Sequence, residues 1–173
     1  RGHDGIAQGG TDQCGWNGFE PVDLLAAHTW QSVQSGGVSV HWSKGDAAFG
    51  KRVLDKAVAS LARLGREAGL PSPADVRLVI YPDSAQMRAA SLHLPEWAGA
   101  VAISDYGTVL LGLAPEDTAF LEEVVPHELA HLVTDQRIDN CTGSHLPTWL
   151  NEGLAVYSEG DLDPSSQEQL DEA

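Results

Sequence analysis

His127-Glu128-Leu129-Ala130-His131 is the stretch from which the fold and chemistry of this chain are best read. Two histidines four residues apart lie about 40° apart around an α-helix and about 6 Å apart along it. Their imidazole rings therefore project from one helix face and can converge on one ion, while Glu128 lies within reach of a water bound to that ion. The pattern predicts the two-histidine zinc site with an adjacent general base that metallohydrolases use; the alternative is a polar helix face without metal.

Residues further along the chain supply a third ligand. Apolar residues at helical spacing can bury the side of the first helix that faces away from the ion: Val124, Val125, Leu129, Leu132 and Val133. The stretch 149–155, Trp-Leu-Asn-Glu-Gly-Leu-Ala, follows after a polar loop, and 20 residues separate its Glu152 from His131. A helix end, a loop and a second helix fit that gap, so we expect the Glu152 carboxylate to complete the ligand set. Two histidines, one glutamate and an open fourth position are a catalytic zinc arrangement rather than a closed structural one.

Both motifs resemble those of the gluzincin metallopeptidases of the peptidase MA clan. The run 124–135 is similar to the thermolysin form of the first motif, and 149–155 to the second motif of the zinc aminopeptidases. Residues 38–159 also resemble the peptidase MA-like domains of bacterial extracytoplasmic proteins. The resemblance implies that His127, His131 and Glu152 bind zinc and that Glu128 is the catalytic base.

Composition excludes several classes of protein. The chain has 173 residues, 42% of them hydrophobic, which is enough for one globular domain with its own core. A net charge of −15 argues against nucleic acid and anionic membranes as partners, since both attract basic surfaces. No apolar run reaches the roughly 18 residues of a membrane span, and no signal peptide is visible. Because the chain starts at Arg1, we expect it to be a processed piece of a longer protein.

The two cysteines leave two interpretations open. Cys14 and Cys141 are too few for a thiolate zinc site, and both lie in loop-like surroundings rich in Gly, Asn and Asp. We expect one Cys14–Cys141 disulfide, which would indicate an oxidising compartment; the alternative is two free thiols. This expectation agrees with an extracytoplasmic protein, secreted or membrane-anchored through regions outside this chain.

The order of elements predicts an α+β, zincin-like fold. We expect an N-terminal extension at 1–37 with helical potential at 22–33, a metallopeptidase domain at 38–160 and an acidic tail or linker at 161–173. Within the domain, the predicted elements are a strand at 38–42, a helix from Asp46 to about Ala68, a buried strand at 76–81, a short helix to about Ala90 and two strands at 99–104 and 108–113. The first strand–helix–strand unit makes a parallel pair, and the last two strands make an antiparallel hairpin. His41 should face solvent, and the loop between the two ligand helices should span 135–146.

The resemblance also bears on specificity and mechanism. In the family, the edge strand before the zinc helix binds the substrate backbone; in aminopeptidases it carries a glutamate that grips the free amine. Residues 99–103 hold that place here as Gly-Ala-Val-Ala-Ile, without the glutamate, so cleavage within a chain fits better. For the residue that stabilises the oxyanion, the candidates are Tyr106, His145 and Tyr157, although Tyr157, five residues past Glu152, should point away from the ion.

The sequence therefore predicts a monomeric zinc metallopeptidase, an endopeptidase acting on a peptide or protein through a zinc-activated water. Two other classes stay open. One is an inactive zinc-binding domain that binds peptides or proteins. The other is an adaptor without metal, in which the motif residues only solvate a helix pair.

Overall fold

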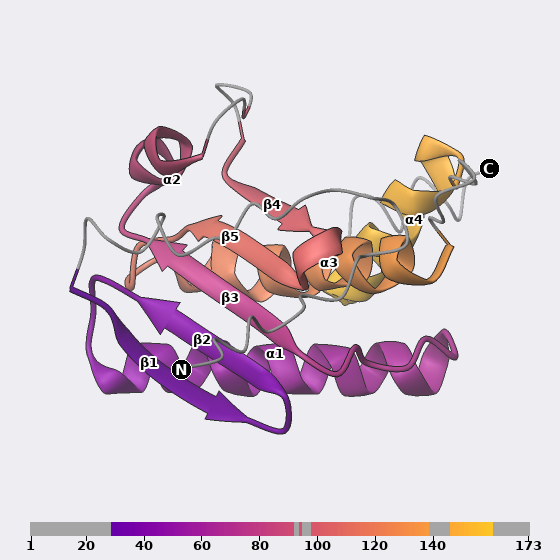
Figure 1. Cartoon of the computed structure of the whole chain (residues 1–173). Coiled ribbons are helices and arrows are strands. Elements are labelled where there is room, and N and C mark those ends of the chain that lie inside the picture. Colours follow the sequence, from indigo (N-terminus) through magenta and orange to yellow (C-terminus); the bar gives the residue numbers. More distant parts are fainter. Residues whose placement is uncertain (1–28, 92–93, 95–97, 139–145, 161–173) are drawn as a thin grey trace, which may run out of the picture.

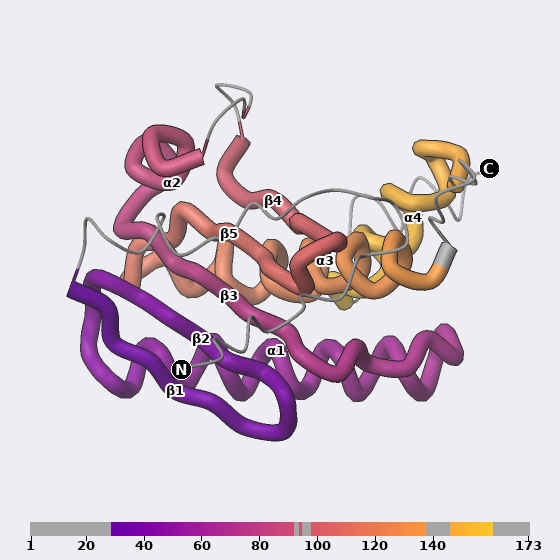
Figure 2. The backbone as a smooth tube through the Cα atoms, in the orientation of Figure 1, coloured from indigo at the N-terminus to yellow at the C-terminus, as the bar shows by residue number. Residues whose placement is uncertain are grey.

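The computed structural model describes residues 29–91, 94, 98–138 and 146–160 of the chain. Figures 1 and 2 show a twisted sheet with two long helices along one face and a short helix near the other. The strands lie in the order β1-β2-β3-β5-β4. In chain order, the elements are β1 (Gln31–Ser35), β2 (Val38–Trp42), α1 (Ala47–Glu67), β3 (Val76–Tyr81), α2 (Ser84–Ala90), β4 (Ala100–Ile103), the 3₁₀ turn η2 (Ser104–Tyr106), β5 (Thr108–Gly112), α3 (Thr118–Ile138) and α4 (Thr148–Glu159).

The sheet is mixed, as the sequence predicts. Its three central strands, β2, β3 and β5, run parallel, and each edge strand pairs antiparallel with its neighbour. The crossover through α1 joins the parallel pair β2 and β3, and β4 forms the expected hairpin with β5. Gly107 closes that hairpin with a φ of +58°, a conformation that glycine adopts without steric cost. The α+β class and the antiparallel edge strand are therefore confirmed.

Local signals place the boundaries of α1. The side chain of Asp46 accepts a hydrogen bond from the Phe49 N–H at 2.9 Å, which satisfies one of the free amides of the first turn. Gly69 follows the helix with a φ of +66°, as is common just beyond a helix end. Both boundaries agree with the sequence prediction.

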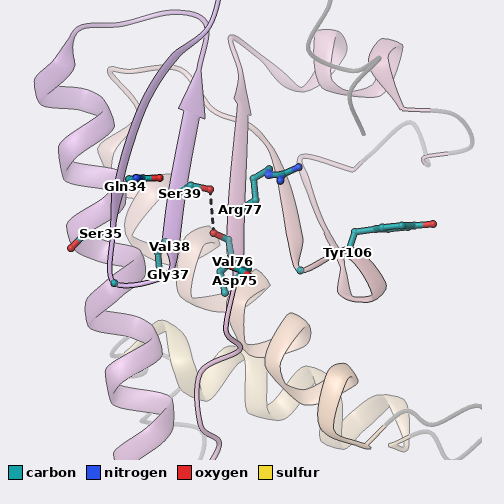
Figure 3. A pocket seen from close by; sticks show the side chains of 11 residues that line it. Gln34, Ser35, Gly37, Val38, Ser39, Asp75, Val76, Arg77 and Tyr106 are labelled. Atoms are coloured by element: carbon teal, nitrogen blue, oxygen red, sulfur yellow. Dashed lines mark hydrogen bonds between the residues drawn. The ribbon is translucent and has the colours of Figure 1, made fainter. Parts of the chain in front are cut away.

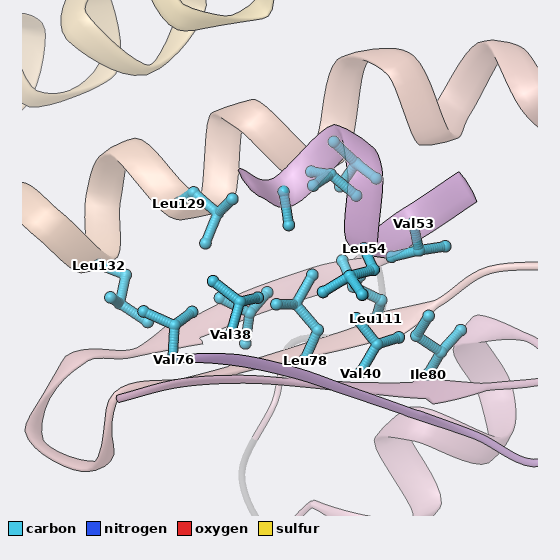
Figure 4. Close-up of a cluster of buried hydrophobic side chains, with 14 of the residues drawn as sticks. Val38, Val40, Val53, Leu54, Val76, Leu78, Ile80, Leu111, Leu129 and Leu132 are labelled. Carbon is cyan, nitrogen blue, oxygen red and sulfur yellow. The ribbon is translucent and has the colours of Figure 1, made fainter. Parts of the chain in front are cut away.

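The core lies between the sheet and the pair α1 and α3. In Figure 4, valines and leucines of the strands point toward Val53 and Leu54 of α1 and toward Leu129 and Leu132 of α3. α4 packs on the side of α3 away from the sheet. Each strand residue in this cluster is followed by one that faces the other side, which is the alternation that a pleated strand imposes. The stretch 127–131, predicted to bind zinc, therefore lies on a helix whose opposite side is anchored in the core.

The structure corrects three expectations. Gln31–Ser35 is a strand paired with β2, although it lies in the predicted extension and overlaps the region 22–33 with helical potential; residues 22–28 lie outside the described part. α3 continues to Ile138, so the first ligand helix extends into the predicted loop. His41 is half-buried rather than solvent-exposed. The length of α3 and the burial of His41 depend on packing between segments, which local patterns do not report. β1 had a local signal, because Gly36 and Gly37, with φ values of +58° and +84°, form the two-residue turn of a hairpin.

Pro126 lies inside α3 and does not end it. A proline removes one amide donor from a helix and crowds the preceding turn, so continuation needs support from packing. Pro126 is buried, and its carbonyl accepts a hydrogen bond from Ser158 Oγ of α4 at 2.8 Å. α4 therefore contacts α3 one residue before His127, the first of the predicted ligands. None of the helices in the described residues has the length and apolar character that a membrane crossing requires.

Candidate metal centre

The structure brings His127, His131 and Glu152 together. The two histidines lie one turn apart on α3 with their Nε2 atoms 3.1 Å apart, and their ring centroids are separated by 4.8 Å. Glu152, on α4, places Oε2 at 3.8 Å from His127 Nε2 and 3.7 Å from His131 Nε2. Its side chain is 54% exposed, whereas those of the histidines are 24% and 15% exposed. The Nε2 atoms of the two largely buried histidines and the carboxylate of the more exposed Glu152 therefore face a common point.

The spacing of these three atoms fits a zinc ion. The point equidistant from the two Nε2 atoms and Oε2 lies about 2.1 Å from each, within the range of zinc bonds to histidine nitrogen and carboxylate oxygen. The donor set, two nitrogens and one oxygen, is also one that zinc prefers. The residues therefore fit the predicted metal, and their roles as ligands stay a prediction.

A second carboxylate contacts His127, the first of the predicted ligands. Glu159 Oε1 lies 2.7 Å from His127 Nδ1, on the ring nitrogen that faces away from the triad. When Nε2 binds a metal, Nδ1 carries the proton and donates to this carboxylate, which fixes the tautomer and ring orientation. The sequence prediction did not include Glu159. The available signal was its spacing, since Glu152 and Glu159 are seven residues apart and so share one face of α4.

Glu128 lies between the triad and the sheet edge. Its carboxylate accepts a hydrogen bond from the backbone N–H of Ala102 in β4. Burial raises the pKa of the Glu128 carboxyl, while the neighbouring His131 and His127 and the Ala102 amide act in the opposite direction. The side chain is therefore held beside both the candidate ligands and the strand that would align a substrate.

Asp135 connects three elements around the centre. Its Oδ2 accepts a hydrogen bond from Ser104 Oγ at 2.9 Å, and its Oδ1 accepts a longer one from Asn151 Nδ2 at 3.4 Å. Gln136 adds a bond from its side chain to the Ser104 carbonyl at 2.6 Å. These bonds link the start of η2, just after β4, to the face of α3 that bears the histidines. They also link that face to Asn151, the residue before Glu152.

Tyr157 points away from the triad, in agreement with its position on α4. Its hydroxyl donates to Glu67 Oε2 at 3.2 Å, and the Arg63 guanidinium lies 5.3 Å from its ring centroid, both on α1. Tyr106 is 39% exposed at the β4–β5 turn. The third oxyanion candidate, His145, and both cysteines lie outside the described residues.

A cavity of about 610 Å³ lies beside the end of β4 and is lined by Ala102, Ile103, Ser104, Asp105, Asp135 and Gln136, none of which belongs to the triad. Two more cavities lie near the sheet. One, of about 490 Å³, lies between the start of β4 and α3 and is lined by His127, Glu128 and Glu159 among others. The other, of about 480 Å³, lies where the β1–β2 hairpin, the start of β3 and the β4–β5 turn meet; Figure 3 shows Arg77 and Tyr106 there. No member of the triad lines the cavity of about 480 Å³ either, so the cavity of about 490 Å³ is the one joined to the candidate metal centre.

Comparison with known proteins agrees with this geometry. The model of the peptidase MA superfamily matches residues 56–173, a range that contains both ligand helices and the edge strand. A search of curated proteins found no match to this chain.

Proposed function

Because this chain belongs to the peptidase MA superfamily, we propose that it is a zinc-dependent metallopeptidase of the gluzincin type with a zincin-like fold. The observation that carries the proposal is the convergence of His127, His131 and Glu152 from two helices, with Glu128 beside them. A structural zinc site would close its fourth position with a protein ligand. Among the described residues, no fourth histidine, cysteine or carboxylate joins these three, and His127 lines the cavity at β4.

Each residue of the candidate centre has a separate role in the proposed hydrolysis. A zinc ion held by His127, His131 and Glu152 would supply Lewis acidity, lowering the pKa of a water and polarising the carbonyl. Glu128 would accept a proton from the water as its oxygen bonds to the carbonyl carbon. It would then donate that proton to the amine nitrogen as the carbon–nitrogen bond breaks. Glu159 would hold the ring of His127 in place throughout.

The edge strand supports cleavage within a chain. β4 pairs with β5 on one side only, so its other edge can bind an extended peptide backbone by strand addition. β4 reads Ala-Val-Ala-Ile and offers no carboxylate that could bind a free amino terminus. The proposed enzyme is therefore an endopeptidase.

Two substitutions test the proposal. Glu128→Gln is nearly isosteric and leaves the three ligands intact, so it should keep zinc but lower hydrolysis by about 10²–10⁴. Glu152→Gln removes a charged ligand and should weaken zinc binding first. The measurements are metal content by elemental analysis and hydrolysis of a peptide mixture followed by mass spectrometry.

Each outcome has a defined meaning. Loss of zinc from Glu128→Gln would contradict its role as base. Wild type that holds zinc yet cleaves no peptide would favour the alternative, an inactive peptide-binding domain. Wild type that binds no zinc would leave only the adaptor without metal.

The proposal extends to location and partners. We propose an extracytoplasmic monomer whose partner is a peptide or protein substrate, on the basis of the resemblance and the predicted Cys14–Cys141 disulfide. In the chain-entropy model, such a long closure adds up to about 4–5 kcal/mol of stability. Counting thiols in denatured, non-reduced protein tests the bridge, and two free thiols per chain would refute it.

A further inference from the structure

The cavity beside the metal centre combines an apolar surface with carboxylates. Its apolar part comes from the start of β4 and the first half of α3: Ala98, Gly99, Ala100, Phe120 and Val124. Three of its polar residues, His127, Glu128 and Glu159, already belong to the candidate centre. The fourth, Glu123, has no part in that centre. No lysine or arginine lines this cavity in the described part of the chain.

Glu123 is an exposed carboxylate on the same helix face as the first ligand. It lies four residues before His127 on α3, one helical turn away. Among the described residues, none forms a hydrogen bond or ion pair with its side chain. The adjacent Glu122 differs, because it pairs with Lys56 Nζ at 2.6 Å on the side facing α1. Glu123 therefore leaves an uncompensated negative charge at the cavity.

The direction of a bound peptide identifies which substrate residue meets the cavity. An antiparallel pairing, the commoner kind, would run the substrate from the Ile103 end of β4 toward the Ala100 end. Glu128 contacts β4 at Ala102, whereas the cavity begins at Ala100. The cleaved bond would thus lie near Ala102, and the residue after it would direct its side chain toward the cavity.

We propose, as a refinement that rests on the proposed function, that this cavity receives a lysine or arginine side chain immediately after the cleaved bond. The aliphatic stem packs on Phe120 and Val124, and the cation reaches Glu123, as long basic side chains bury their stems and keep their charged ends near water. Glu123 is then a specificity-determining residue. The chain's net charge of −15 favours the approach of such basic substrates.

Binding to zinc-loaded Glu128→Gln tests this selection without relying on hydrolysis. Dye-labelled peptides of alanine and glycine carry one variable residue: lysine, arginine, norleucine or glutamate. Norleucine keeps the aliphatic stem and lacks the charge. Fluorescence anisotropy should show lysine and arginine peptides binding about 1.5-fold to fivefold more tightly than the norleucine peptide, the size expected of an exposed ion pair. With wild type, mass spectrometry should locate cleavage on the amino side of the basic residue.

Two further substitutions test the contribution of the Glu123 charge. Each is made in the Glu128→Gln background for the binding assay and in wild type for the cleavage assay. Glu123→Gln should abolish the preference for lysine over norleucine, and Glu123→Lys should shift it toward glutamate. Glu122→Gln is the matched control, because it removes the same charge from the adjacent position outside the cavity and should keep the preference.

The outcomes separate the two proposals. A Glu123-dependent preference in binding, together with cleavage on the amino side of the basic residue, supports the inference. The same preference in binding without any hydrolysis by wild type supports Glu123 as the residue that selects the basic side chain and refutes the proposed function alone. Hydrolysis with equal use of lysine and norleucine peptides, or cleavage after rather than before the basic residue, overturns the inference and leaves the proposed function intact. An equal loss of preference in Glu122→Gln and Glu123→Gln would overturn it too.

Discussion

Removal of the Glu159 carboxylate should weaken zinc binding although Glu159 is not a predicted ligand. The bond from His127 Nδ1 to Glu159 Oε1 is 2.7 Å long, in the range of charge-assisted hydrogen bonds. Loss of such an outer partner typically lowers metal affinity 10- to 100-fold. The side chain of Glu159 is 30% exposed, so solvent screens part of the interaction and the lower part of that range applies. For Glu159→Ala we expect about a tenfold to thirtyfold loss, or about 1.4–2.0 kcal/mol.

A graded series distinguishes the hydrogen bond from its charge. Glu159→Gln keeps a carbonyl oxygen that can accept from Nδ1–H but loses the charge. Because charge-assisted bonds are about twice as strong as neutral ones, this variant should lose only about threefold to fivefold. Tyr157→Phe is the control, since it removes a hydrogen bond from the same helix on the side facing α1 and should bind zinc like wild type.

The assay is titration of zinc-free protein in competition with a chromogenic chelator at fixed pH, with circular dichroism to verify the fold. If Glu159→Ala binds zinc within about twofold of wild type, the positioning role is refuted. If Tyr157→Phe weakens binding equally, the effect comes from a less stable α4 and not from the contact with His127.

Three other measurements test the fold and the specificity. A Cβ on Gly112 would collide with the Ser84 backbone at the start of α2, so Gly112→Ala should lower the free energy of unfolding by about 1–3 kcal/mol. At Gly153, inside α4, no atom lies near the position of an added Cβ, so Gly153→Ala should raise the free energy of unfolding by up to about 1 kcal/mol. Urea denaturation measures both variants, and equal effects would contradict the packing at Gly112. Burial, and then the nearby Arg77, lower the pKa of His41 below its usual 6.5, so the folded protein takes up this proton less readily than the unfolded chain and stability falls as the pH drops below about 6.5. In chelated protein, His41→Asn should lose less stability than wild type over that interval, and parallel pH profiles would refute the assignment. Blocking the amino terminus of a cleaved peptide should leave its rate unchanged, and strict dependence on the free amine would contradict the endopeptidase proposal.

Short-range spacing in the sequence determined several elements of the fold and part of the candidate metal centre. The pair His127 and His131 shares a helix face because four residues make about one turn, whatever the helix packs against. The cap at Asp46 and the alternation in β2 are equally local, and the structure has both where the sequence predicts them. The convergence of Glu152 on the histidines was predictable in outline, because two motifs with apolar flanks can bury themselves only by pairing their helices.

Only the tertiary structure decided which faces meet. Glu159 contacts His127, and Tyr157 contacts Glu67, because α4 packs on α3 with one rotation about its axis; the sequence of α4 alone allows others. β1 is a different case, because a short-range signal was present: Gly36 and Gly37, with φ values of +58° and +84°, form the two-residue turn that pairs β1 with β2, and the prediction of an N-terminal extension missed it. The charge of Glu123 faces a cavity, while that of Glu122 meets Lys56, although the two residues are adjacent and chemically identical. Local spacing determines which side chains share a face, whereas the burial of whole apolar surfaces between distant segments determines what that face contacts.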